Sequence, residues 1–321
     1  MNRLLISISK YCLAVVLGLS LVSPLSAQAA LHEALDFDGD GRADWSVVRP
    51  SENNWYIFGS AGSIVVQNFG LATDDFQTPG DFDGDNKGDI AVWRETNGLW
   101  YILNSSNNTF TSASWGIPGD QPVQRDYDGD GKTDLAVIRR ANGLMIWWIL
   151  QSSNGAINAY QWGLSGDFPV PGDYDGDGKY DMAVQRPGPT GSSQAAFFIL
   201  ASTDGFIYHN YAFSNDVAVP GDYDGDGKTD LAVVREGAGP EDPLSWYILR
   251  SSDFGFMAVQ WGTTGTDILT QADYDGDGKT DIAIWRNSNT HYYVRASSTE
   301  TLQFAQWGLN NDIPLAGYNQ F

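Results

Sequence analysis

The chain has 321 residues, with 18 Lys and Arg against 40 Asp and Glu, so its formal net charge is −22. This acidity argues against nucleic acid and anionic membrane surfaces as partners, because both are bound by neutralising phosphates with Lys and Arg. It does not indicate disorder, since 12 Trp, 15 Tyr and 15 Phe require a folded core.

Residues 1–29 have the features of a signal peptide. Arg3 and Lys10 give a basic start, residues 11–22 form an apolar run, and residues 27–29 (AQA) supply a small-residue cleavage site. The run is shorter than the roughly 20 residues that span a bilayer, so we expect no membrane insertion. The mature protein, residues 30–321, is therefore expected to be secreted: extracellular, at the cell surface, or in the periplasm. Its only cysteine lies in the signal peptide, so stability must come from the core or from metals.

A nine-residue acidic loop occurs six times in the mature chain. The copies start at Asp36, Asp81, Asp126, Asp173, Asp222 and Asp273, at intervals of 45 to 51 residues. That period is typical of a propeller blade of four short strands, and it is too long for a nine-residue calcium β-roll.

The same landmarks follow each acidic loop in order. In the third unit these are an alternating segment at 135–139, an aromatic segment at 147–150, a segment ending in Trp162-Gly163, and an approach segment at 168–172 that leads into the next loop. No apolar pattern at helical spacing occurs. We therefore expect an all-β fold in which residues 30–321 form a single β-propeller domain. Six blades follow from the six loops, and seven would need one cryptic unit.

The C-terminal segment predicts how the ring closes. Residues 312–317 repeat the approach segment seen at 167–172, but no acidic loop follows them. We expect this strand to pair with the N-terminal blade, because closure removes exposed sheet edges that would invite aggregation.

The acidic loops are predicted to bind about six Ca²⁺ ions, because this ion favours six to eight oxygen ligands, such as carboxylates at alternate loop positions. Positions 1, 3, 5 and 9 are Asp in every copy, and position 7 can add a backbone carbonyl. The predicted ligands are Asp36, Asp38, Asp40, Arg42, Asp44; Asp81, Asp83, Asp85, Lys87, Asp89; Asp126, Asp128, Asp130, Lys132, Asp134; Asp173, Asp175, Asp177, Lys179, Asp181; Asp222, Asp224, Asp226, Lys228, Asp230; and Asp273, Asp275, Asp277, Lys279, Asp281.

Two other interpretations of these loops are weaker. An EF-hand needs Glu at position 12, where every copy has Val or Ile. Acidic turns capped by their own side chains would leave four carboxylates repelling one another within nine residues. The loops hold 24 Asp and six Lys or Arg, and hence most of the net negative charge.

Residues 126–137, DYDGDGKTDLAV, resemble the FG-GAP/VCBS-type repeat, which builds the calcium-bearing propeller of integrin α-subunits and of many exported bacterial proteins. The resemblance covers nearly all of the mature chain. It implies a propeller with each loop between the first and second strands of a blade. It also implies roles in adhesion or in ligand or glycan recognition, or as an accessory module of larger enzymes. Integrin propellers have seven blades and fewer calcium loops, so their blade count does not transfer.

Three further features invite a structural or a functional interpretation. An arginine stands 13 residues after each loop start, and we expect it to pair with a loop carboxylate or stack on an aromatic ring. The periodic tryptophans are expected in the core, whereas Trp93 and Trp285 break the pattern and are candidates for a surface role. Long hairpins at 187–193 and 236–243 occur on consecutive units, which makes them candidate binding loops.

The function favoured by these observations is a binding or adhesion module for a glycan or for a cell-surface or extracellular protein. The alternatives are a polysaccharide-active lyase or hydrolase on the same scaffold, and a purely structural envelope or matrix protein. We do not expect an enzyme, because the carboxylate clusters recur sixfold, whereas a catalytic centre is normally one asymmetric constellation.

Overall fold

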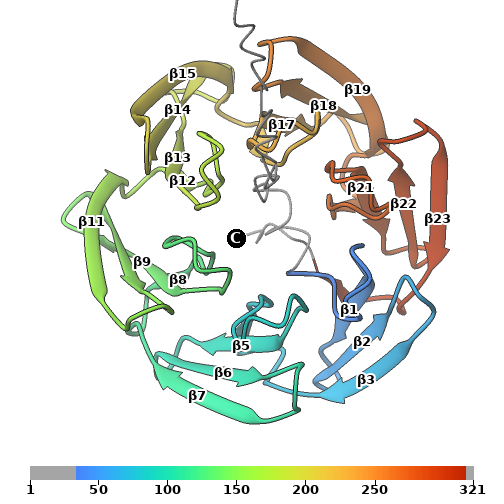
Figure 1. Ribbon diagram of the computed structural model, residues 1–321. Coiled ribbons are helices and arrows are strands. Elements are labelled where there is room, and N and C mark those ends of the chain that lie inside the picture. Colours follow the sequence, from blue (N-terminus) through green and yellow to red (C-terminus); the bar gives the residue numbers. More distant parts are fainter. Residues whose placement is uncertain (1–33, 316–321) are drawn as a thin grey trace, which may run out of the picture.

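The computed structural model describes residues 34–315, and these form a six-bladed β-propeller. Six four-stranded antiparallel sheets are arranged around a central axis (Figure 1). No helix long and apolar enough to cross a membrane occurs within residues 34–315. The predicted signal peptide and the last residues of the predicted C-terminal segment lie outside the described residues.

Each blade has the same strand order from the axis outwards, and we number the blades 1 to 6 along the chain. The strands are β24 (Ile313–Pro314), β1 (Trp45–Arg49), β2 (Asn54–Phe58), β3 (Ile64–Asn68); β4 (Asp75–Gln77), β5 (Ile90–Arg94), β6 (Leu99–Leu103), β7 (Phe110–Ser114); β8 (Gln121–Pro122), β9 (Leu135–Ala141), β10 (Leu144–Leu150), β11 (Ile157–Leu164); β12 (Phe168–Pro169), β13 (Met182–Arg186), β14 (Gln194–Ala201), β15 (Gly205–Phe213); β16 (Val217–Ala218), β17 (Leu231–Arg235), β18 (Pro243–Leu249), β19 (Phe256–Thr263); and β20 (Asp267–Leu269), β21 (Ile282–Arg286), β22 (His291–Arg295), β23 (Leu302–Gln306).

The strand sequences reflect their place in the blade. The second strand of each blade is an apolar run, such as IAVWR in β5, because the two adjacent blades cover both of its faces. The third strand alternates between buried and half-buried residues, as in LMIWWIL of β10. The outermost strands carry more exposed positions. The core therefore consists of the contact layers between adjacent blades.

The ring is closed as the sequence predicts. β24, from the C-terminal end, is the innermost strand of blade 1, where Pro314 and Ile313 pair with Val47 and Val48 of β1. The backbone N–H of Leu315 donates to the carbonyl of Ser46 over 2.9 Å. The two ends of the described chain thus share one sheet.

Aromatic side chains fill the layers between the blades. The equivalent residues of the third strands are fully buried, which confirms their predicted core role; they are Trp55, Trp100, Trp147, Phe197, Trp246 and Tyr292.

The suggested surface role of Trp93 and Trp285 is wrong, because both are also fully buried. They lie on second strands, which are covered on both faces. The ring of Trp93 lies 6.4 Å from that of Trp100, and its Nε1 donates to the carbonyl of Trp115 over 3.0 Å.

Indole groups also connect one blade to the next. The Trp at the end of an outermost strand donates from Nε1 to a third-strand carbonyl of the following blade at four junctions. The pairs are Trp115 to Trp148, Trp162 to Phe198, Trp261 to Tyr293, and Trp307 to Tyr56, over 3.0 to 3.2 Å. Phe69 and Tyr211 hold the equivalent positions at the other two junctions, between blades 1 and 2 and between blades 4 and 5.

The repeated arginines have a structural role. Each forms a two-pronged ion pair with a buried aspartate of the approach segment rather than with a carboxylate of the acidic loop. In blades 2 to 6 this aspartate stands 19 residues earlier in the chain. Each guanidinium also lies over a neighbouring aromatic ring. In blade 1 the partner comes from β24 and its preceding turn. The pairs are Arg49–Asp312, Arg94–Asp75, Arg139–Asp120, Arg186–Asp167, Arg235–Asp216 and Arg286–Asp267.

Replacing Asp312 by Ala should lower the free energy of unfolding by about 3–5 kcal/mol, because Arg49 would lose the partner that holds the closing strand. The Asp312 side chain is only 2% exposed. The matched control is Asp253→Ala, which removes the exposed pair with Arg250 and should cost below about 1 kcal/mol. Urea unfolding measures both, and equal losses would contradict a role for Asp312 in closure.

Candidate metal centres

Each acidic loop folds around its first aspartate. In the loop at 173–181, Oδ1 of Asp173 accepts from the backbone N–H of Gly176 over 2.6 Å, and Oδ2 accepts from that of Gly178 over 2.8 Å. Both glycines have positive φ, +76° and +84°, which a side chain would strain. Asn86 holds the second of these positions in the loop at 81–89, with φ +64°, a conformation that Asn tolerates better than most residues.

The aspartate at position 9 joins the loop to the rest of its blade. Oδ2 of Asp181 accepts from the backbone N–H of Tyr174 over 2.8 Å, and Oδ1 accepts from that of Ser202 over 2.7 Å. Ser202 opens the turn between the third and outermost strands. The acidic loop and this turn thus meet at one end of the blade, while the long hairpins at 187–193 and 236–243 lie at the opposite strand ends.

The contact with this serine turn was not predicted. The hydroxyl of the turn serine donates to the aspartate at position 5, as from Ser152 to Asp130 over 2.9 Å. The next residue often donates to the aspartate at position 3, as from Ser153 to Asp128 over 2.6 Å. A signal was present, because a serine stands five residues after the buried aromatic in every blade: Ser60, Ser105, Ser152, Ser202, Ser251 and Ser297.

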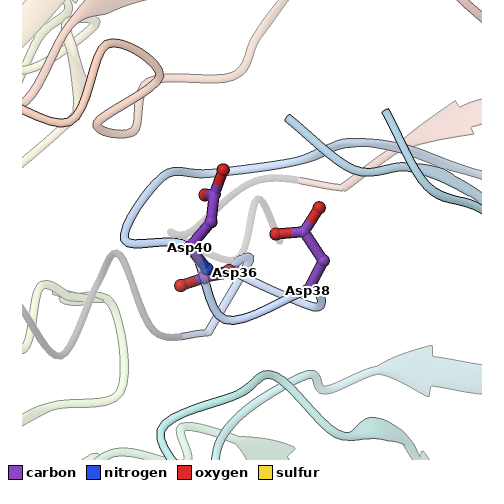
Figure 2. Close-up of side chains that lie close together, drawn as sticks. All are labelled: Asp36, Asp38 and Asp40. Atoms are coloured by element: carbon purple, nitrogen blue, oxygen red, sulfur yellow. Dashed lines mark hydrogen bonds between the residues drawn. The ribbon is translucent and has the colours of Figure 1, made fainter. Parts of the chain in front are cut away.

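The loop carboxylates converge closely enough to hold a metal ion. In Asp36, Asp38 and Asp40, three carboxylate oxygens lie within 4.8 Å of one another, and Figure 2 shows these side chains gathered on one tight loop. Corresponding groups come from four other loops: Asp81, Asp83, Asp85; Asp126, Asp128, Asp134; Asp173, Asp175, Asp181; and Asp222, Asp224, Asp226.

One oxygen in each of three loops supports this interpretation. In three loops, Oδ1 of the aspartate at position 3 is buried and has no hydrogen-bond partner; these residues are Asp38, Asp83 and Asp175. Buried polar atoms are normally satisfied, so an unpaired carboxylate oxygen beside other carboxylates suits a cation ligand. The residues present therefore fit a metal ion bound entirely by oxygen.

Electrostatics also favour a cation in the loops. Burial raises the pKa of Asp134 to about 7, against the effect of the N–H of Ser152, and the charge of Asp128 adds to the rise. Burial likewise raises the pKa of Asp44, Asp181, Asp230 and Asp281 to about 7, and that of Asp89 to about 6. Keeping these carboxylates ionised at neutral pH therefore costs free energy that a bound cation would offset.

The seventh residue directs its side chain away from its own loop. The backbone N–H of Lys87 donates to Asp85, but its Nζ donates to the carbonyl of Asp38 in the preceding loop over 2.9 Å. Lys132 makes the same contact with Asp83. Arg42, Lys179, Lys228 and Lys279 lie against the position-4 glycine of the preceding loop. Their predicted role as backbone-carbonyl ligands stays a prediction.

Backbone hydrogen bonds join the six loops into a closed ring. The N–H at position 8 of each loop donates to the carbonyl at position 1 of the preceding loop over 2.6 to 2.8 Å. Ala43 closes the ring by donating to Asp273 of the last loop over 2.8 Å. Each candidate metal centre is therefore attached to both of its neighbours.

Comparison with known proteins supports this architecture. The family of FG-GAP-like repeats matches residues 126–184 and 222–284, and each match contains two acidic loops, those starting at 126 and 173 and those starting at 222 and 273. No curated protein sequence is significantly similar to the chain.

The chain can also be compared with two solved structures. A lectin from Agrocybe aegerita that recognises non-reducing terminal N-acetylglucosamine has a TM-score of 0.50 and 16% identity, with 81% of this chain and 88% of that chain covered. A triple arginine-to-alanine mutant of AofleA from Arthrobotrys oligospora has a TM-score of 0.49 and 12% identity, with coverages of 88% and 90%. The likeness to the lectin shows the fold alone.

In a chelator, the free energy of unfolding should fall as the pH rises from about 5 to about 8. Aspartates at loop position 9, such as Asp134 and Asp181, have a pKa of about 7 in the folded protein, against an ordinary value of 3.8. The folded state therefore binds more protons than the unfolded state between these values, and its advantage is lost as the carboxylates ionise. Urea unfolding in EDTA at several pH values measures this. Stability that rises over the same range would contradict the desolvation of these groups.

Proposed function

We propose that this β-propeller, in which residues 126–184 and 222–284 match FG-GAP-like repeats, is an exported calcium-binding module that recognises a glycan. Residues 1–29 serve as the signal peptide in this proposal, and residues 30–321 form the exported propeller domain. The observation that carries the metal part is the buried, unpaired carboxylate oxygen that faces other carboxylates in the acidic loops.

Calcium suits these loops better than other common metals. The predicted donors are carboxylates and backbone carbonyls, without His or Cys, and hard oxygen donors favour Ca²⁺, Mg²⁺ and Mn²⁺ over zinc or copper. Mg²⁺ retains several waters and demands near-ideal octahedral geometry, whereas Ca²⁺ accepts many protein oxygens at variable angles. Four aspartates on one tight loop resemble the second arrangement.

Calcium binding would replace the disulfides that many exported proteins use. If each loop binds with a Kd of about 0.1 mM, calcium near 1 mM would stabilise the fold by about 1.4 kcal/mol per loop. Six loops would then contribute an amount comparable to the whole net stability of an ordinary domain.

Glycan recognition is supported by the fold and by the distribution of chemistry. The lectin from Agrocybe aegerita has the same architecture and recognises a terminal sugar. The acidic clusters of this chain recur around the ring, which suits a scaffold better than a single catalytic centre. Binding without turnover is therefore the activity we propose.

The metal part predicts a countable loss. The wild-type protein should bind about six Ca²⁺ ions, and Asp126→Asn combined with Asp128→Asn should remove one, since two of the carboxylates of that loop lose their charge. The matched control is Asp74→Asn, an exposed acid outside the loops. Elemental analysis after dialysis counts the ions. An absence of bound metal, with the same melting temperature in EDTA and in calcium, would refute the proposal.

The binding part predicts retention without cleavage. On an array of oligosaccharides, the protein should bind at least one glycan in millimolar calcium, and EDTA should reduce the signal because the loops hold neighbouring blades together. New reducing ends or unsaturated products would instead indicate a hydrolase or lyase. An empty array would favour a structural role.

A further inference from the structure

The junction between blades 4 and 5 differs from the others and contains a pocket. Tyr211 stands there in place of the tryptophan that connects blades at four other junctions. At the same junction, between β14 and β15 of blade 4 and the edge of blade 5, lies a cavity of about 190 Å³. Its lining includes Asp204 and His209 from blade 4, and Arg250 and Phe254 from blade 5.

Three of these residues, His209, Arg250 and Phe254, do not belong to the repeat. Where His209 stands, the other blades have Gln67, Ala113, Tyr160, Val259 and Ala305. Where Arg250 stands, they have Gly59, Asn104, Gln151, Ala201 and Ala296. The repeated residues account for the scaffold, so a constellation found at one junction only is a candidate for recognition of a ligand.

Phe254 is held in a conformation that its side chain does not favour. Its φ is +56°, in the left-handed region, where bulky residues are rare. The equivalent turn positions in blades 2, 3, 4 and 6 also have positive φ but carry Asn108, Gly155, Gly205 and Glu300. The ring of Phe254 is 66% exposed and lies 6.2 Å from the His209 ring at the pocket. Residues held in sparsely populated backbone conformations cluster at active sites and ligand clamps.

The chemistry of the pocket fits one uncharged sugar. The exposed Phe254 ring offers an apolar face for the C–H groups of a pyranose, while Asp204 and Arg250 offer an acceptor and a donor for its hydroxyl groups. Burial lowers the pKa of His209, so its imidazole is neutral at pH 7 and provides one donor and one acceptor.

Charge and size narrow the ligand further. Asp204 and Lys228 at the pocket carry opposite charges, and Arg250 is paired with Asp253 over 2.8 Å, so no surplus positive charge favours an acidic sugar. The volume lies below the roughly 300–1,000 Å³ of pockets for drug-sized ligands, which leaves room for a single ring.

We infer that the pocket between blades 4 and 5 binds the uncharged terminal sugar of a glycan, with Phe254 as its stacking platform. This inference rests on the proposed glycan-binding function and assigns it a site. The site lies at the acidic-loop end of the blades, on the same two blades as the long hairpins at 187–193 and 236–243 but at the opposite strand ends. Those hairpins are not part of it.

The test compares Phe254→Asn with Phe304→Asn in the full chain. Phe304 lies on the outermost strand of blade 6 and is also 66% exposed, so it is a matched control. The probes are glucose, galactose, mannose, N-acetylglucosamine and glucuronic acid, screened by saturation-transfer NMR, with calorimetry for any that binds. Phe254→Asn should weaken binding of an uncharged sugar at least tenfold, and Phe304→Asn should not. Asn tolerates positive φ, so the melting temperature should not fall.

A second readout locates the ligand independently of any variant. The imidazole NMR signals of His209 should shift when the sugar is added to the wild-type protein, whereas those of His291 should not. If sugars bind but Phe254→Asn retains wild-type affinity and the His209 signals stay unchanged, the site assignment is wrong and the proposed function stands. Preference for glucuronic acid would overturn the uncharged ligand. If neither these sugars nor an oligosaccharide array binds, the proposed function itself fails.

Discussion

The crowding of carboxylates near the axis is the constraint on which the rest of the molecule depends. Each acidic loop contains four aspartates, and burial raises the pKa of the aspartate at position 9, such as Asp134, towards neutrality. Turn N–H groups and serine hydroxyls satisfy part of this charge, as at Asp181 and Ser202. A bound cation would offset the cost of keeping the remaining charge ionised. The same aspartates therefore shape each loop, join it to its blade and form its candidate metal centre.

Much of the fold could be predicted because it is periodic. The spacing of the loops indicated a propeller, and their number predicted six blades. The approach segment at 312–317, which no acidic loop follows, predicted the closure that β24 makes with β1. The serine turn was missed because its distance from the loop varies with hairpin length, although its distance from the buried aromatic does not. Trp93 was misjudged because sequence alternation cannot reveal that a strand is covered on both faces.

Residues that depart from the repeat could not be predicted with the same ease. His209 and Phe254 are 45 positions apart and come together only where two blades meet. The sequence shows that each departs from the repeat, but the contact between their rings follows only from the packing of blade 4 against blade 5. The repeated residues thus predict the scaffold, whereas a candidate recognition site emerges only from the packing of specific neighbours.

The hydrogen bonds from position 8 to position 1 have a consequence for how the molecule comes apart. In an open array of repeats, the two outer units lack a neighbour and unravel first, so such arrays need capping units. Here Ala43 donates to Asp273, and the first loop is as fully engaged as any other. The ring of loops therefore has no terminal blade from which unfolding can start. Unfolding must first separate two adjacent blades.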